Sequence, residues 1–255
     1  MSGCIFKKAT PTGSLPVAEP TPVPTRPIDQ TIKERPYVSL LPTQDRHWVT
    51  LEIKNIPKGT KGFEYDLIYL ADFEGSKIER GVSTGGIPVE LNGATEYSKK
   101  ILFGSASCTT GTCKYKYDEN VNEGSLSLNF VGGSLTEKLQ TAYRIQKGKE
   151  AAVDGFTTGD GVFTLRTNLP ANSIYLTASS IGVPSQLPAG VIPKTAPYAV
   201  YPAVLGKVAI TFKTDLVSPT IYAFEGKSWQ KLITTVAGGE AKAEASGASV
   251  FILAQ

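Results

Sequence analysis

The sequence has little charge, no cluster of basic residues and no long apolar run. Charged residues make up 19% of the 255 residues, and the net charge of +3 is spread along the chain without a block of like charges. A nucleic-acid partner usually requires a dense basic face, so we expect no nucleic acid to bind. No apolar run is long enough to span a bilayer.

Histidine is almost absent as well: the sequence contains a single one, His47. A catalytic histidine needs a nucleophile and an orienting group beside it, and no Gly-x-Ser-x-Gly motif supplies the serine. The alternation around His47 places it at a strand end, on the same face as Val49 and near the core. We therefore expect no catalytic residue and a protein that is not an enzyme.

Two groups of carboxylates are the remaining candidates for chemistry. Asp118 and Glu119 follow a predicted strand, whereas Asp154 and Asp160 lie in a Gly/Asp-rich stretch. Paired carboxylates can perform glycosidase chemistry or bind calcium, but neither spacing matches an EF-hand. Because Asp-Gly pairs are ordinary turn residues, we expect turns, no metal and no cofactor. If calcium binds at all, residues 148–160 are the predicted place.

Glycine and proline are abundant instead, with 25 and 17 residues. Together with a hydrophobic content of 41%, they indicate short strands joined by tight turns rather than helices. Apolar and polar residues alternate in 49–54, 125–130 and 138–145, which is typical of half-buried strands. The predicted fold class is all-β, with two immunoglobulin-like β-sandwich domains. The sequence leaves the order of the strands in these sheets open.

The predicted organisation has four parts. Residues 1–36 form a lipid anchor and a disordered proline-rich tether, residues 37–147 a first sandwich, residues 148–160 a Gly/Asp-rich hinge, and residues 161–255 a second sandwich. The tether composition favours polyproline II, which rises ~3 Å per residue and acts as a semi-rigid spacer. The proline-rich segment 184–202 is predicted to be a connection or an edge, because proline cannot donate to a ladder.

The N-terminal Ser2-Gly3-Cys4 resembles the cleavage site of a bacterial lipoprotein signal, where the cysteine becomes the first residue and carries the lipid. The apolar stretch expected before such a site does not precede Ser2 in this sequence. Either that stretch lies upstream of this sequence, or the start is assigned wrongly, or the Ser-Gly-Cys is a chance occurrence. The Pro/Thr spacer that follows favours the lipoprotein interpretation. We therefore predict lipid attachment at Cys4 and an extracellular location, anchored to the cell membrane.

Cys108 and Cys113, separated by Thr-Thr-Gly-Thr, can face each other across a hairpin. The alternative is half of a zinc site, but four ligands are usual and no second cysteine pair or nearby histidine is present. We therefore predict a disulfide, which implies an oxidising compartment and agrees with export.

Three aromatic residues are the predicted ligand contacts. Trp48 falls on the polar face of its strand, and Tyr198 and Tyr201 lie in the proline-rich segment. Exposed aromatic rings can stack on sugars or form the hot spot of a protein interface, so a surface glycan or a protein is the expected partner. The alternative is that Trp48 covers a core edge and the tyrosines pack on prolines.

The run that begins at Gly111 and contains Cys113-Lys-Tyr-Lys-Tyr-Asp-Glu and the strand Gly124-Ser-Leu-Ser-Leu is similar to a segment of uncharacterised exported lipoproteins of candidate-phyla (Patescibacteria-type) bacteria. In that family a cysteine-bounded turn leads to Tyr-Asp-Glu and a Gly-x-Leu-x-Leu strand. The resemblance covers residues 37–147. It implies export and an immunoglobulin-like β domain, and no activity.

These observations predict a non-enzymatic cell-surface lipoprotein that acts in adhesion, scaffolding or ligand binding. One alternative is a carbohydrate-active hydrolase or a carbohydrate-binding module. The other is a structural subunit of a surface layer or pilus, which would assemble through strand edges.

Overall fold

The computed structural model describes residues 30–135 and 138–255, so the predictions for Cys4 and for the tether up to residue 29 lie outside the described residues. The described chain is nearly all antiparallel β-structure, which confirms the all-β prediction. Its helices are a 3-10 turn at Gln30–Lys33 and α1 (Gly148–Asp154). Within these residues, neither helix has the length and apolar character needed to cross a membrane.

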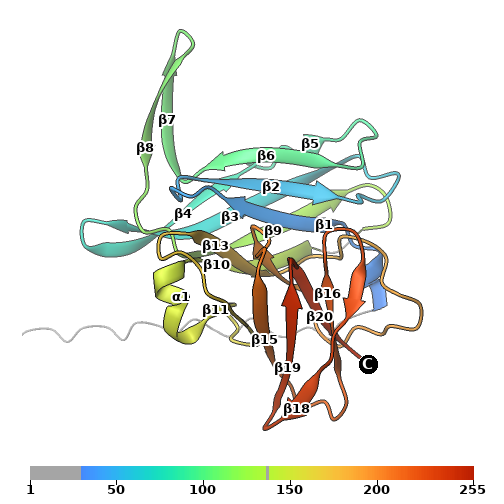
Figure 1. The fold of residues 1–255 in the computed structure, drawn as a ribbon. Helices are drawn as coiled ribbons and strands as arrows, with labels where there is room; N and C mark the ends of the chain where they lie inside the picture. The colour runs from blue at the N-terminus through green and yellow to red at the C-terminus, as the bar shows by residue number, and fades with distance from the viewer. Residues whose placement is uncertain (1–29, 136–137) are drawn as a thin grey trace, which may run out of the picture.

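A ten-stranded sheet forms the middle of the molecule (Figure 1). In sheet order its strands are β17 (Trp229–Lys231), β16 (Thr220–Phe224), β20 (Val250–Ala254), β14 (Tyr198–Tyr201), β13 (Ile174–Ser179), β10 (Lys138–Lys147), β9 (Glu123–Val131), β3 (Gly62–Phe73) and β4 (Ser76–Ser83), with β5 (Val89–Glu90) paired to β3. Its two halves are covered by different layers.

A three-stranded sheet lies over the half that contains β3 and β9, and a five-stranded sheet packs on the half that contains β16 and β20 (Figure 1). The first consists of β1 (Tyr37–Pro42), β2 (Trp48–Lys54) and β6 (Tyr97–Leu102), and the second of β11 (Phe156–Thr157), β12 (Phe163–Arg166), β15 (Lys207–Lys213), β19 (Glu240–Ser246) and β18 (Thr235–Ala237). A separate hairpin, β7 (Gly104–Thr109) and β8 (Thr112–Tyr117), projects from the body.

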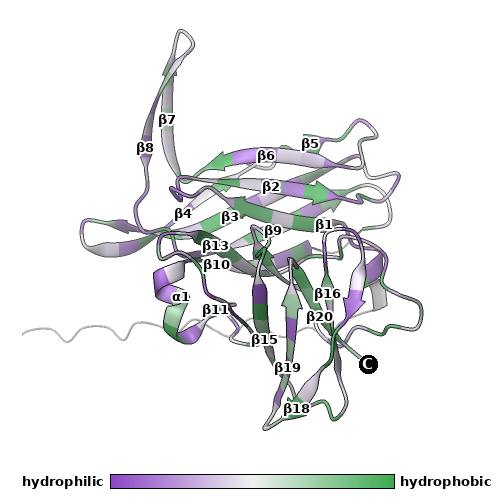
Figure 2. Cartoon of the chain, in the orientation of Figure 1, coloured by the Kyte–Doolittle hydropathy of each residue, from purple (hydrophilic) through white to green (hydrophobic). Residues whose placement is uncertain are grey.

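Strand β20 shows how the layers share one sheet. Val250 and Ile252 belong to the core that also contains the inner side chains of the three-stranded sheet, whereas Phe251 and Leu253 belong to the core against the five-stranded sheet. A strand covered on both faces must be apolar at every position, and β20 is apolar along its whole length (Figure 2). The molecule is therefore sandwich-like, with the long sheet as the shared layer.

The predicted hinge, residues 148–160, is structured and contains α1 and β11. Strand β10, which ends just before it, pairs directly with β13, the second strand after it, with Lys147 opposite Ile174. Backbone hydrogen bonds thus join the two predicted domains, which differs from the expectation of two separate sandwiches linked by a hinge. Asp160 lies in a turn as expected, whereas Asp154 is the last residue of α1 and Gly155 caps that helix. Such residues carry no information on which distant strands pair. The domain boundaries themselves stay a prediction.

Candidate ligand-binding site

Tyr198 and Tyr201 lie in the interior, not on the surface. Each is 5% exposed and belongs to β14, which pairs with β13 on one side and β20 on the other. The Tyr198 hydroxyl donates to Asp160 Oδ2 at 2.7 Å, and the Tyr201 and Tyr37 hydroxyl oxygens are 2.6 Å apart. Their burial corrects the expectation that these two rings contact a ligand.

The prolines around these tyrosines explain the difference. Proline disfavours a paired strand only where its missing N–H would be needed. Pro197 and Pro202 fall just outside β14, so the four residues between them pair freely and form an internal strand rather than the expected connection or edge.

The carboxylate of Asp160 is held by the turn in which it lies. Its Oδ1 accepts hydrogen bonds from the Thr158 hydroxyl at 2.6 Å and from the Val162 backbone N–H at 3.0 Å, and its Oδ2 accepts the Tyr198 bond. Among residues 30–135 and 138–255, no three His, Cys, Asp or Glu side chains are grouped as a metal site.

Trp48, in contrast, begins a row of aromatic rings. Its ring centroid lies 5.4 Å from that of Tyr115 in an edge-on contact, and the Tyr115 and Tyr117 centroids are 6.1 Å apart with planes only 12° apart. Tyr117 in turn stacks on His47, with a centroid separation of 3.8 Å. We call Trp48, Tyr115, Tyr117 and His47 the aromatic ribbon. Lys100 adds a cation at one end, because its Nζ lies 4.9 Å from the centroid of the Trp48 ring.

Strand alternation places these rings on one surface. Val49, Leu51 and Ile53 are buried on the inner face of β2, so Trp48 points outward. Tyr115 and Tyr117 are two residues apart on β8 and share a face. Their cross-strand partners on β7 are Ala106 and Gly104, which are too small to cover the rings, and the two tyrosines remain 46% and 38% exposed.

Gly104 is required at the base of the hairpin. Its φ of +142° is unfavourable for other residues, and an added Cβ would lie 2.1 Å from the Lys116 carbonyl oxygen. The buried Tyr69 hydroxyl anchors the same point, because it accepts from the Gly104 N–H at 3.1 Å and donates to Asp118 Oδ2 at 2.8 Å. Burial, followed by the bond to Asp118, raises the pKa of Tyr69.

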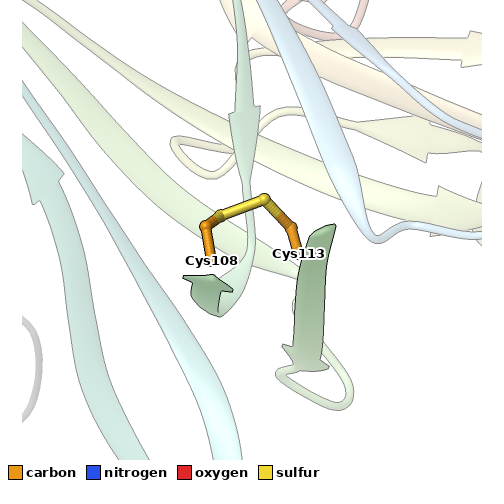
Figure 3. Close-up of a disulfide and its surroundings, with 2 residues drawn as sticks. All are labelled: Cys108 and Cys113. Atoms are coloured by element: carbon orange, nitrogen blue, oxygen red, sulfur yellow. A yellow bond between two sulfur atoms is a disulfide. The ribbon is translucent and has the colours of Figure 1, made fainter. Parts of the chain in front are cut away.

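The outer part of the hairpin is held by the predicted disulfide (Figure 3). Cys108 and Cys113 are opposite each other in the β7–β8 register, with Cα atoms 4.0 Å apart and a bond between the sulfur atoms. Among residues 30–135 and 138–255, β7 and β8 pair only with each other, and residues 105–112 are exposed. Because an isolated two-stranded hairpin is only marginally stable in water, the disulfide supplies constraint that a core would otherwise give.

An open depression of about 440 Å³ adjoins the ribbon. Its lining residues are Asp45, Arg46, His47, Tyr117, Asp118, Glu119, Asn120 and Val121. His47 and Tyr117 belong to both features, so the ribbon and the depression form one continuous surface. The Asp118 side chain is only 13% exposed, and its Oδ2 also lies 3.8 Å from Arg80 Nε.

The turn before β2 fixes the His47 ring. Arg46 has a φ of 61°, which interrupts the strand alternation before β2. His47 therefore stacks on Tyr117, whereas the alternation predicts that it lies near the core. His47 Nδ1 lies 3.3 Å from Asp45 Oδ2. A hydrogen bond from the Thr43 hydroxyl, helped by the His47 backbone N–H, lowers the pKa of Asp45.

Sequence reasoning missed Tyr115 and Tyr117 as members of this surface. A signal was present, since Lys114-Tyr115-Lys116-Tyr117 alternates within a predicted hairpin arm. No protein-family model, curated protein or solved structure matches the chain. The candidate site therefore depends on its own geometry.

Proposed function

We propose that the protein is a non-enzymatic cell-surface lipoprotein, anchored through a lipid on Cys4, that captures a ligand with the aromatic ribbon. The observation that carries this proposal is the row of four rings, joined by three ring contacts, that lies on the surface beside an open depression. Tyrosine and tryptophan provide large contact areas at low entropic cost, which is why they dominate binding hot spots.

Two further observations support a surface location. The Cys108–Cys113 disulfide suits an oxidising compartment, where small exposed structures are commonly cross-linked. The short antiparallel strands with alternating burial suit an exported sandwich, and an immunoglobulin-like type of sandwich is part of the same proposal. A tether before residue 37 would hold the ribbon away from the membrane.

A carbohydrate-active hydrolase is the second candidate, because Asp45, Asp118 and Glu119 line the same depression. Paired carboxylates are the usual groups for glycoside hydrolysis. Asp45 is bonded to His47 and Thr43, and one oxygen of Asp118, Oδ2, is bonded to Tyr69, so binding remains the better supported function. Loss of a measured hydrolysis in a Glu119→Gln variant would establish the enzyme instead.

The third expectation, a structural subunit that assembles through strand edges, has less support. The outer strand β4 carries Lys77, Glu79 and Arg80, and charges on an edge discourage pairing with another chain.

A retention assay tests the proposed function. The full chain is passed over immobilised bacterial cell-wall polysaccharide, alongside the variants Trp48→Ala and Tyr222→Ala. Tyr222 is a partly buried tyrosine on β16, next to the edge strand β17 of the ten-stranded sheet, and serves as the matched control. The aromatic ribbon lies outside that sheet, on β2, β8 and the turn before β2. We expect Trp48→Ala to lose retention and Tyr222→Ala to keep it. Equal retention of Trp48→Ala and the wild-type protein would contradict capture by the ribbon.

A further inference from the structure

We infer that the ligand is a neutral, polyhydroxylated glycan whose sugar rings lie along the aromatic ribbon and whose hydroxyl groups enter the depression beside Tyr117. This inference rests on the proposed function, and it adds the chemical class of the ligand. Three features of the surface carry it: the succession of rings, the mixture of charges, and the placement of polar groups at both ends.

The succession of rings selects a ligand that is itself built of linked rings. Trp48, Tyr115 and Tyr117 follow one another at centroid separations of 5.4 and 6.1 Å. A single small ring would cover one of these side chains and leave the others in water. The planes of Tyr115 and Tyr117 are 12° apart, that of Trp48 is turned 72° from Tyr115, and His47 covers one face of Tyr117. A chain of linked sugars can follow this row and contact the exposed part of each side chain in turn, so each added unit buries further apolar surface.

The mixture of charges excludes strongly charged polymers. Lys100 lies on Trp48 at one end, whereas Asp118 and Glu119 line the depression at the other. A polyanion would meet the carboxylates, and a polycation would meet Lys100 and Arg46. Because unlike charges across an interface attract and like charges repel, a neutral chain avoids both penalties. This pattern also disfavours single-stranded nucleic acid, although its bases could stack on the rings.

The polar groups at the depression suit hydroxyl groups. Both contacts of Asp118 fall on Oδ2, and within the described part of the chain no donor contacts Oδ1. In the same residues no basic nitrogen lies within ion-pairing distance of Glu119. A carboxylate accepts hydrogen bonds, and a hydroxyl group can donate to it and also accept from a lysine or arginine. Sugar hydroxyls therefore fit both ends of the surface.

The test uses Trp48 as its own reporter. The chain has two tryptophans, and Trp229 is 8% exposed. A Trp229→Phe variant of the full chain leaves Trp48 as the sole tryptophan. Its fluorescence is titrated with soluble hexamers of glucose, mannose and N-acetylglucosamine, with polygalacturonate as the polyanion, and with oligothymidylate as the nucleic acid.

We expect at least one neutral hexamer to change the Trp48 fluorescence saturably, with little dependence on salt because few charges are involved. Tyr115→Ala is expected to weaken this binding by between about 5-fold and about 150-fold, the loss of one stacking ring. Tyr115→Phe keeps the aromatic ring and should retain the binding, and the control Tyr222→Ala should retain it too. Because Tyr115 lies on the exposed hairpin, neither substitution of Tyr115 disturbs a core.

The outcomes separate the two proposals. Ribbon-dependent retention on cell-wall polysaccharide, without saturable binding of any neutral hexamer, would overturn the ligand class and leave the proposed function. Tighter binding of polygalacturonate or oligothymidylate than of every neutral hexamer would overturn it as well. Retention on cell-wall polysaccharide that is unchanged in the Trp48→Ala variant would contradict the proposed function itself.

Discussion

Reduction of the Cys108–Cys113 disulfide should open the β7–β8 hairpin while the body of the protein stays folded. The hairpin pairs with no other sheet of the described residues. Its base is fixed by the hydrogen bonds of the Tyr69 hydroxyl and by a backbone bond of 3.0 Å, which the Asp118 N–H donates to the Phe103 carbonyl oxygen. The outer strands therefore have little besides their own ladder and the disulfide to keep them closed.

The magnitude follows from the size of the ring. The two cysteines are five positions apart, and closure of so short a loop contributes about 2 kcal/mol in the chain-entropy model. A difference of that size changes an equilibrium constant about 30-fold. We therefore expect the open form of the hairpin to become about 30-fold more populated after reduction, with a small change in the thermal midpoint of the body.

Limited trypsin digestion measures this directly, because Lys114 and Lys116 lie on the exposed strand β8. Cleavage that depends on local opening should accelerate by up to the same factor in reducing agent or in a Cys108→Ser/Cys113→Ser variant. A Cys4→Ser variant keeps the disulfide and is the control. Equal cleavage rates with and without the disulfide, or cooperative unfolding of the whole protein on reduction, would refute this reasoning.

Three further predictions concern the interior. Phe251→Ala should destabilise the protein by about 3–5 kcal/mol in urea unfolding, because Phe251 is fully buried and packs on Phe163; a change below 1 kcal/mol would contradict a tight second core. Tyr198→Phe should cost about 0.5–1.5 kcal/mol, because the hydrogen bond to Asp160 is lost while that exposed carboxylate can still be hydrated, and an unchanged urea midpoint would argue against that bond. Burial raises the pKa of Tyr37 to about 12, above its usual value near 10, so the neutral form is favoured in the folded state. The associated stability is complete below about pH 10 and is lost as the pH rises towards 12, which urea midpoints measured across that range should show; a flat profile would be inconsistent with it.

Local features of the fold were predictable from the sequence, and distant pairings were not. Period-two alternation located β2 and placed Trp48 outward, and the short Cys108–Cys113 spacing predicted the hairpin disulfide. The pairing of β10 with β13 joins strands on either side of α1, and nothing in either strand specifies the other. The single shared sheet therefore appears only when all strands are placed together.

The candidate site divides in the same way. Trp48 was predicted as a ligand contact, and it remains on the surface. Tyr198 and Tyr201 were misplaced because their flanking prolines suggested an irregular segment, although the four residues between them form an internal strand. Tyr115 was overlooked because alternation cannot reveal that a hairpin projects away from every core.

Hydrogen–deuterium exchange of the full chain, with and without saturating cell-wall polysaccharide, tests capture by the aromatic ribbon most directly. Ligand seated on the ribbon should slow amide exchange in β8, in residues 45–48 and in residues 118–121, which surround the depression. Exchange in β18, at the far edge of the five-stranded sheet, should not change. Protection centred on another surface, or identical exchange in both samples at saturating polysaccharide, would contradict capture by these rings.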